Sequence, residues 1–153
     1  MDTVDRKILD LLQRDGGRAL ADIAEAVGLS TTPCWRRIQR LEKDGVIRRR
    51  VALLDRDRIG LGVTVIVRVR TNRHDSEWLE QFARTVEDID EIVEVYRMSG
   101  DIDYVLKVVV PDIATYDAIY KRLITAVPLM DVSSNFAMEE LKFSTRLPLG
   151  YAP

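Results

Sequence analysis

The sequence predicts an α+β protein made of an N-terminal helix-turn-helix with three helices, a linking strand, and a C-terminal ferredoxin-like β-α-β-β-α-β sandwich. Apolar residues recur every three or four positions through the first fifty residues, which is typical of amphipathic helices. Residues 63–143 instead mix β-branched alternation with helical patterns. The charge changes at the same point, from a net +3 in residues 1–50 to a net −5 in residues 51–153. We therefore expect domains at 1–50 and 63–153, joined by a linker at 51–62.

Each of the first two predicted helices ends at glycine. Residues 2–14 form the first helix and stop at Asp15-Gly16-Gly17, since paired glycines favour a turn. Residues 20–27 form the second helix, and Gly28 ends it. The third helix starts at Ser30, only two residues later. So short an interval lets the second and third helices cross steeply, which is the helix-turn-helix arrangement.

The predicted third helix, residues 30–45, has one apolar side and one cationic side. Its Ser30 hydroxyl can accept from a first-turn amide, and Gly45 suits a helix end. The apolar stripe consists of Cys34, Ile38 and Leu41, and the cationic side of Arg36, Arg40 and Lys43. Residues 30–50 hold seven Lys and Arg against two Asp and Glu, which favours phosphate binding there. The alternative is a solvated cationic surface.

Three consecutive arginines, Arg48 to Arg50, follow the third helix. We interpret the segment from Val46 as a short extended stretch, a candidate wing, that runs into the linker. Successive side chains of an extended chain point to opposite faces, so at most two of these arginines could meet one phosphate backbone. They could instead brace the linker or keep it soluble.

The C-terminal part alternates strands with helices. The predicted strands are residues 63–70, 91–98, 103–110 and 132–143, and the predicted helices are residues 76–86 and a segment opened by Pro111-Asp112. The second and third strands are so close in sequence that they must form a hairpin. Both helices then cover one face of a four-stranded antiparallel sheet, and the other face keeps apolar residues. Such a face predicts burial against a second subunit.

Composition argues against several functional classes. One cysteine excludes an intramolecular disulfide, and one cysteine with one histidine argues against a zinc site within the chain. No apolar run approaches the roughly 20 residues that span a bilayer, and the charged N-terminus does not resemble a signal peptide. No nucleophile–base pair or phosphate-cradling glycine loop is visible, so we expect no enzyme and no cofactor, although the fold hosts enzymes. A cytoplasmic protein is the simplest interpretation.

Three segments carry a family resemblance: LADIAEAVGLSTTPCWRRIQRLEKDGVI (20–47), MSGDIDYVLKVVVPD (98–112) and SSNFAMEE (133–140). Together they resemble the Lrp/AsnC (feast/famine) transcription regulators over essentially the whole chain. The resemblance implies dimers that assemble into tetramers, octamers or larger discs, bind double-stranded DNA and respond to amino acids. The phrases are closest to the cysteine-responsive branch or to a branched-chain-amino-acid-responsive branch, so cysteine is the specific guess. The alternative is a ligand-independent nucleoid-organising protein that wraps DNA.

The resemblance assigns DNA contacts to the start of the third helix. The candidates are Ser30, Thr31, Thr32, Pro33, Trp35, Arg36, Arg40 and Arg48. Threonine can bond base edges or phosphates. Arg36 could reach guanine or a phosphate, and Arg40 a phosphate. Trp35 is left open between packing beside the second helix and flanking the sugar-phosphate backbone.

The resemblance also implies an effector site at the turn between two strands, where two dimers meet. The candidates are Met98, Ser99, Gly100, Asp101, Asp103, Ser134 and Phe136. Loop amides near Gly100 would hold an amino-acid carboxylate, and Asp101 or Asp103 its ammonium group. Ser134 and Phe136 share one face of the last strand and could complete the pocket. The alternative is an ordinary turn in which Asp103 caps backbone amides.

Overall fold

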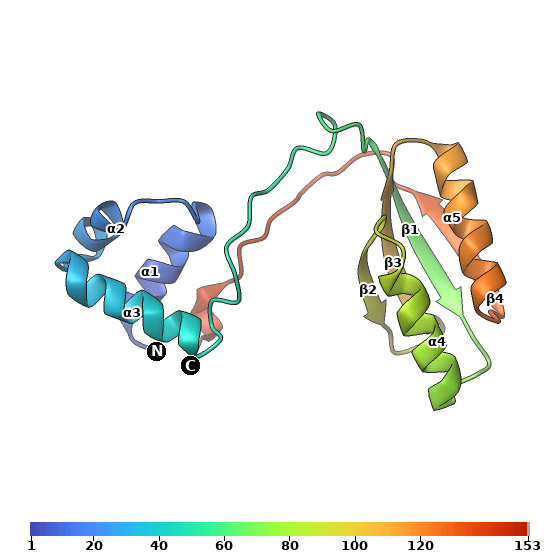
Figure 1. Ribbon diagram of the computed structural model, residues 1–153, viewed down its shortest axis with the longest axis horizontal. Helices are drawn as coiled ribbons and strands as arrows, with labels where there is room; N and C mark the ends of the chain where they lie inside the picture. Colours follow the sequence, from blue (N-terminus) through green and yellow to red (C-terminus); the bar gives the residue numbers. More distant parts are fainter. Residues whose placement is uncertain (153) are drawn as a thin grey trace. The chain divides into compact units, whose positions relative to one another are not determined.

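The computed structural model describes residues 1–152, which form two compact units (Figure 1). The helical unit comprises residues 1–53 and 142–152, and the sheet unit comprises residues 54–141. The sequence-based boundaries therefore differ from the structure at the C-terminus, because the last residues pack on the helices and not on the sheet. The linker at 51–62 is divided between the two units.

The helical unit contains the expected three helices. They are α1 (Thr3–Arg14), α2 (Leu20–Val27) and α3 (Thr31–Lys43). A capping box opens α1, since the Asp2 carboxylate accepts from the Asp5 amide and the Asp5 carboxylate accepts from the Asp2 amide. Gly28 ends α2 in the left-handed conformation, with φ of 71°. The Leu29 amide then donates to the Ala24 carbonyl, which closes the turn that leads into α3.

The core of the helical unit is small and lies where the three helices meet. The buried stripe of α3 is the predicted one, because Cys34, Ile38 and Leu41 are all buried. Ile8 of α1 and Ile23 of α2 pack into the same cluster. The structure therefore confirms that the apolar stripe predicted from the sequence is the side of α3 that packs on the other helices.

The chain end returns to this unit and packs against α1. The Gln13 side-chain amide pairs with the Leu147 backbone in both directions, at 3.1 Å and 2.9 Å. The Arg6 guanidinium donates to the Ala152 carbonyl at 2.8 Å. Leu149 packs against the helical core from the short 3-10 helix η1 (Leu149–Tyr151). Two peptide segments, at 53–54 and 141–142, therefore connect the two units.

The sheet unit has the predicted β-α-β-β-α-β order. Its elements are β1 (Val63–Arg70), α4 (Ser76–Glu87), β2 (Ile92–Arg97), β3 (Tyr104–Val110), α5 (Ile113–Ala126) and β4 (Asp131–Phe136). The strands form one antiparallel sheet in the order β2-β3-β1-β4. The last strand is shorter than predicted, because its pairing with β1 ends at Phe136 opposite Val65 and Met138 beyond it is 95% exposed. Among the described residues, no helix has the length and apolar character needed to cross a membrane.

Both helices of the sheet unit cover the same face of the sheet (Figure 1). Trp78 of α4 is buried there, stacks on Phe82 with ring centroids 5.1 Å apart, and donates to the Pro128 carbonyl at 2.8 Å. The strands contribute the alternate residues of β1 and β3, including Val67 and Leu106. The opposite face has a mixed character, since it carries Ile66, Val105 and Tyr96 together with an ion pair between Lys107 and Glu94 at 3.1 Å.

The linking strand predicted between the units does not form, since no residue from 46 to 62 belongs to a strand in the described chain. The segment is extended and then turns at residues 56–60. Its apolar side chains Val51, Leu53 and Leu54 are each more than 60% exposed. A strand needs a paired neighbour to satisfy its backbone hydrogen bonds, and the described residues supply none to this segment.

Candidate nucleic-acid interface and effector loop

The first turn of α3 is exposed and has no side-chain cap. Ser30 occupies the N-cap position as predicted, but its hydroxyl accepts no capping hydrogen bond. Thr31, Thr32 and Pro33 are all exposed. First-turn amides without a side-chain acceptor, at the positive end of the helix dipole, are suited to binding an anion such as a phosphate.

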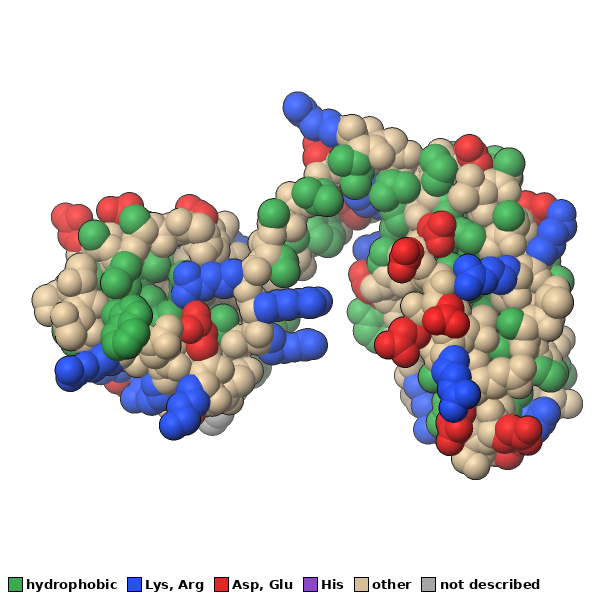
Figure 2. Space-filling model, in the orientation of Figure 1, with side chains coloured by type: hydrophobic (Ala, Val, Ile, Leu, Met, Phe, Trp, Pro, Cys, Tyr) green, Lys and Arg blue, Asp and Glu red, His purple; other side chains and the backbone are tan. Residues whose placement is uncertain are grey.

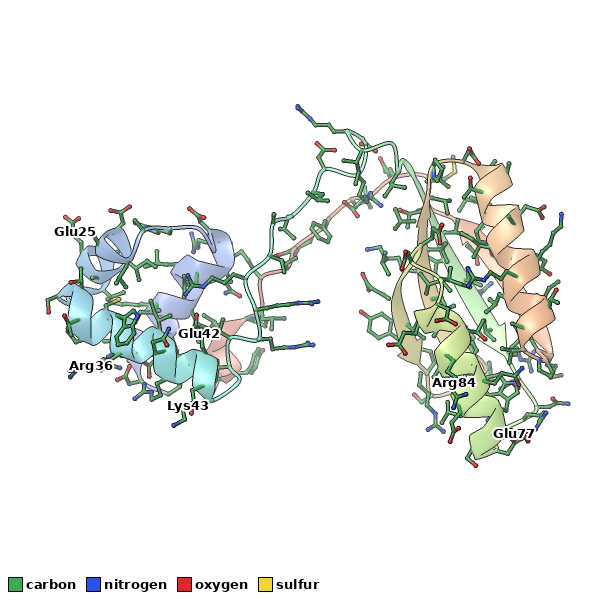
Figure 3. All side chains as sticks on the ribbon, viewed as in Figure 1. Glu25, Arg36, Glu42, Lys43, Glu77 and Arg84 are labelled. Carbon is green, nitrogen blue, oxygen red and sulfur yellow. The ribbon has the colours of Figure 1, made fainter. Side chains whose placement is uncertain are left out.

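The outward side of α3 is cationic. The helix turns by about 100° per residue, which places Arg36 and Lys43 on the side opposite the buried stripe. Figure 3 shows both directed away from the body of the unit, and Figure 2 shows Lys and Arg side chains gathered over α3. Gln39 lies between them on the same side and donates to Glu42 at 2.9 Å. Lys43 was expected on the cationic side but not among the DNA contacts, and Gln39 was not singled out, although its spacing from Arg36 contained the signal.

The other two cations of α3 bind a buried carboxylate of α1. Asp5 is 1% exposed and accepts from Arg37 at 2.8 Å and from Arg40 at 2.6 Å. Arg37 also donates to Asp2 at 2.6 Å. These hydrogen bonds raise the pKa of the Arg37 guanidinium, and the pKa of Asp2 is lowered by the Asp5 amide and then by Arg37. Arg40, expected on a phosphate, is therefore engaged inside the unit, with its side chain 54% exposed.

Trp35, whose placement the sequence left open, has a partly accessible side chain. The indole is 50% exposed and is not part of the helical core, so it lies on the surface beside the outward side of α3. Its neighbour Cys34 is fully buried, and this burial raises the pKa of the thiol. Trp35 is therefore available to a ligand of the helix, whereas Cys34 serves packing.

The arginines after α3 are divided between the two proposed roles. Arg50 forms an ion pair with Glu42 at 3.0 Å, so it braces the segment that leaves α3. Arg48 and Arg49 are exposed and have no ion pair among the described residues. Arg48 therefore stays a candidate DNA contact, and Arg49 is a second one that the sequence analysis did not single out.

The predicted effector loop lies between β2 and β3. Met98, Ser99 and Asp101 are exposed, and Gly100 has φ of 109°, a backbone conformation that favours glycine. Asp103 differs, because its carboxylate accepts from the Thr71 amide at 2.8 Å. The alternative role of Asp103 as a backbone cap is thus confirmed, whereas the Asp101 carboxylate accepts no such hydrogen bond within residues 1–152.

Ser134 and Phe136 lie apart from this loop in the single chain. They share one face of β4 as predicted, and that face is the helix-covered one. The Ser134 hydroxyl hydrogen-bonds the Tyr116 hydroxyl, and the Phe136 ring meets the Tyr116 ring edge-on at 5.4 Å. Burial raises the pKa of Tyr116. Since β4 and β2 are opposite edges of the sheet, one chain does not bring the two sets of residues together.

Two cavities among the described residues lie away from the predicted effector loop. Cavities of about 520 Å³ and 880 Å³ lie in the helical unit, and none of the predicted effector residues lines them. No group of three or more His, Cys, Asp or Glu side chains among residues 1–152 is placed to hold a metal ion.

Both units resemble domains of known proteins. Residues 64–147 match the Lrp/AsnC ligand binding domain, and residues 1–48 match a winged helix-turn-helix DNA-binding model. The glutamate uptake regulatory protein of Zymomonas mobilis is 52% identical over 97% of this chain and 91% of its own length. An AsnC family transcriptional regulator from Agrobacterium tumefaciens is 60% identical, with a TM-score of 0.96 over the full length of both chains.

A third relative was solved with a ligand. This transcriptional regulator from Neisseria meningitidis, in complex with L-Met, is 32% identical, with a TM-score of 0.94 over 98% of this chain and 97% of its own. The matches extend over the exposed cationic helix and over the sheet that carries the β2–β3 loop. The chain therefore belongs to the Lrp/AsnC family of transcriptional regulators, with a helix-turn-helix DNA-binding domain followed by a ligand-binding domain.

Proposed function

We propose that the outward side of α3 enters the major groove of double-stranded DNA, and that an amino acid bound at the β2–β3 loop controls this binding. One observation carries the first half of the proposal. Arg36 and Lys43 are exposed on the side of α3 opposite its core stripe, beside an uncapped first turn. A helix that presents its N-terminal residues and cations in this way matches how recognition helices meet base edges and phosphates.

The roles of the individual side chains follow from their chemistry. Thr31 and Thr32 can bond base edges, and their methyl groups can touch thymine. Arg36 can bind a guanine edge with two hydrogen bonds, and Lys43 can bind a phosphate as a point charge. Arg48 extends the phosphate contacts beyond the end of the helix.

The effector would be held by the loop and completed by another copy of the chain. Backbone amides around Gly100 suit a carboxylate, and Asp101 suits an ammonium group, because Asp103 already caps Thr71. The sheet face without helices carries Ile66, Val105 and the half-exposed Tyr96, which supports pairing of two chains there. An amino acid bound between copies then stabilises whichever assembly binds it better, and so shifts DNA binding.

Electrophoretic mobility shifts test the DNA half of the proposal. The probes are duplexes enriched from genomic DNA by the wild-type protein, with random-sequence duplexes for comparison. Arg36→Ala should weaken binding to the enriched duplexes about tenfold. The matched control is Arg84→Ala, which removes a 78%-exposed arginine of α4 (Figure 3) and should leave binding unchanged. Equal affinity of Arg36→Ala and wild type would refute this use of α3.

Thermal shift and sedimentation test the effector half. The wild-type protein is titrated with each of the twenty amino acids, cysteine among them, and Asp101→Ala should lose the stabilisation while it keeps DNA binding. If amino acids stabilise Asp101→Ala as much as they stabilise the wild type, Asp101 is not part of the effector site. Footprints that run over long phased tracts, without sequence preference and unaffected by any amino acid, would favour the DNA-wrapping alternative and association with the nucleoid.

A further inference from the structure

One carboxylate of the helical unit is buried although the unit is small. Asp5, in the first turn of α1, is 1% exposed. A buried charge is costly unless it is paired and hydrogen-bonded, so its partners are held there by a large energetic preference. Those partners come from α3, the helix that we propose to bind DNA.

The geometry satisfies Asp5 completely and uses half of the cations of α3. One carboxylate oxygen accepts from Arg37 at 2.8 Å. The other accepts from Arg40 at 2.6 Å and from the Asp2 amide at 3.3 Å. The helix has four cationic residues, so the remaining two, Arg36 and Lys43, have no share in this cluster.

The position of Arg40 makes this pairing consequential. Arg40 lies four residues after Arg36, so the two side chains are neighbours on the helix surface. The Arg40 side chain is half exposed, and the sequence predicts a phosphate contact for it. An exposed phosphate in water attracts it less strongly than a buried carboxylate does, because the field of the buried charge is screened less.

We propose that Asp5 is a positioning residue for DNA recognition, because its carboxylate withholds Arg40 and Arg37 from the phosphates. The inference rests on the proposed function. Arg36 and Lys43 are then the cations of α3 that meet DNA. Asp5 also sets the rotation of α3 about its axis, since turning the helix would break the hydrogen bonds of both arginines at once.

The salt dependence of DNA binding tests this assignment, since each phosphate contact contributes about 0.9 to the slope of log affinity against log salt. We compare Arg40→Met, which keeps an aliphatic stem but removes the charge, with the matched variant Arg36→Met. Arg40→Met should keep the wild-type salt dependence, whereas Arg36→Met should make the dependence shallower by about one. An equally shallower salt dependence in both variants would overturn the role of Asp5 and leave the proposed function standing.

Asp5→Asn supplies the converse measurement. It frees Arg40, whereas Arg37 keeps its hydrogen bond to Asp2, so the salt dependence should become steeper by about one. The double variant Asp5→Asn/Arg40→Met should return to the wild-type salt dependence. Far-UV circular dichroism establishes that Asp5→Asn is folded, and a folded Asp5→Asn with the wild-type slope overturns the proposal. Should Asp5→Asn unfold, the comparison of Arg40→Met with Arg36→Met decides alone. Unchanged affinity and slope in every variant would overturn the proposed function together with this inference.

Discussion

Replacing two adjacent arginines of α3 by alanine should affect different properties of the protein. Arg37 points to the buried Asp5, and Arg36 points away from the unit. Arg37→Ala should therefore destabilise the helical unit, while Arg36→Ala should weaken DNA binding and leave stability unchanged. The pair is a sharp test because both variants remove the same side chain from neighbouring positions of one helix.

The size of the effect follows from the contacts of Arg37. Its hydrogen bond to Asp5 joins an arginine side chain that is 28% exposed to an aspartate side chain that is 2% exposed. A hydrogen bond to a charged group of this kind contributes about 1.5–3 kcal/mol. The contact with Asp2 adds little, because that carboxylate is half exposed and screened by solvent. Arg40 still pairs with Asp5, so the full cost of stripping a buried charge is not reached, and we expect a loss of about 2 kcal/mol.

Differential scanning calorimetry is the suitable assay, since two compact units need not unfold in one transition. For a unit of this size, 1 kcal/mol corresponds to roughly 4–8 °C in Tm, so Arg37→Ala should lower the midpoint of the helical unit by about 8–16 °C. Arg36→Ala should stay within about 0.5 kcal/mol of wild type. An unchanged midpoint for Arg37→Ala, or an equal fall for Arg36→Ala, would refute the assignment of the buried ion pair.

Three further predictions test other parts of the structure. Hydrogen bonds from Arg73 and then from the Trp78 amide lower the pKa of Asp75, the N-cap of α4, below its ordinary value of 3.8. This pairing stabilises the fold above pH 3.8 and is lost as the pH falls through the lower folded-state value, so acid unfolding followed by circular dichroism should be less steep in Asp75→Asn. The Cys34 thiol, 0% exposed, should react with a thiol reagent only in denaturant, and rapid labelling of the native protein would contradict its burial. Gly100→Ala should cost about 1–2 kcal/mol in urea unfolding from backbone strain alone, since φ is +109° and no atom lies within 4 Å of the new Cβ.

Local patterns in the sequence were sufficient for most elements of the fold. The glycine at position 28 marked the end of α2, and the spacing of Cys34, Ile38 and Leu41 gave the buried side of α3. The alternation in residues 63–70 gave β1 with its observed bounds. These features depend on residues a few positions apart, which is why they can be read without coordinates.

The features that sequence reasoning missed depend on distant residues. Asp5 and Arg40 are 35 positions apart, so nothing near either one indicates that they pair. The predicted last strand continues to Phe143, yet beyond Phe136 the described residues show only one backbone hydrogen bond to the sheet, in which the Ala137 amide donates to the Thr64 carbonyl. The role of Asp103 was open for the same reason, because the Thr71 amide that it caps comes from another strand's end.

The return of the chain end to α1 changes how a signal could pass along the polypeptide. With Gln13 holding Leu147 and Arg6 holding Ala152, the path out through residues 51–62 and back through residues 137–141 is a closed circuit. A single flexible hinge would let the DNA-binding half swivel without regard to events in the sheet. Here two chain segments link the sheet to the helices, and the one that follows β4 leads to α1, where Asp5 accepts from Arg37 and Arg40 of α3.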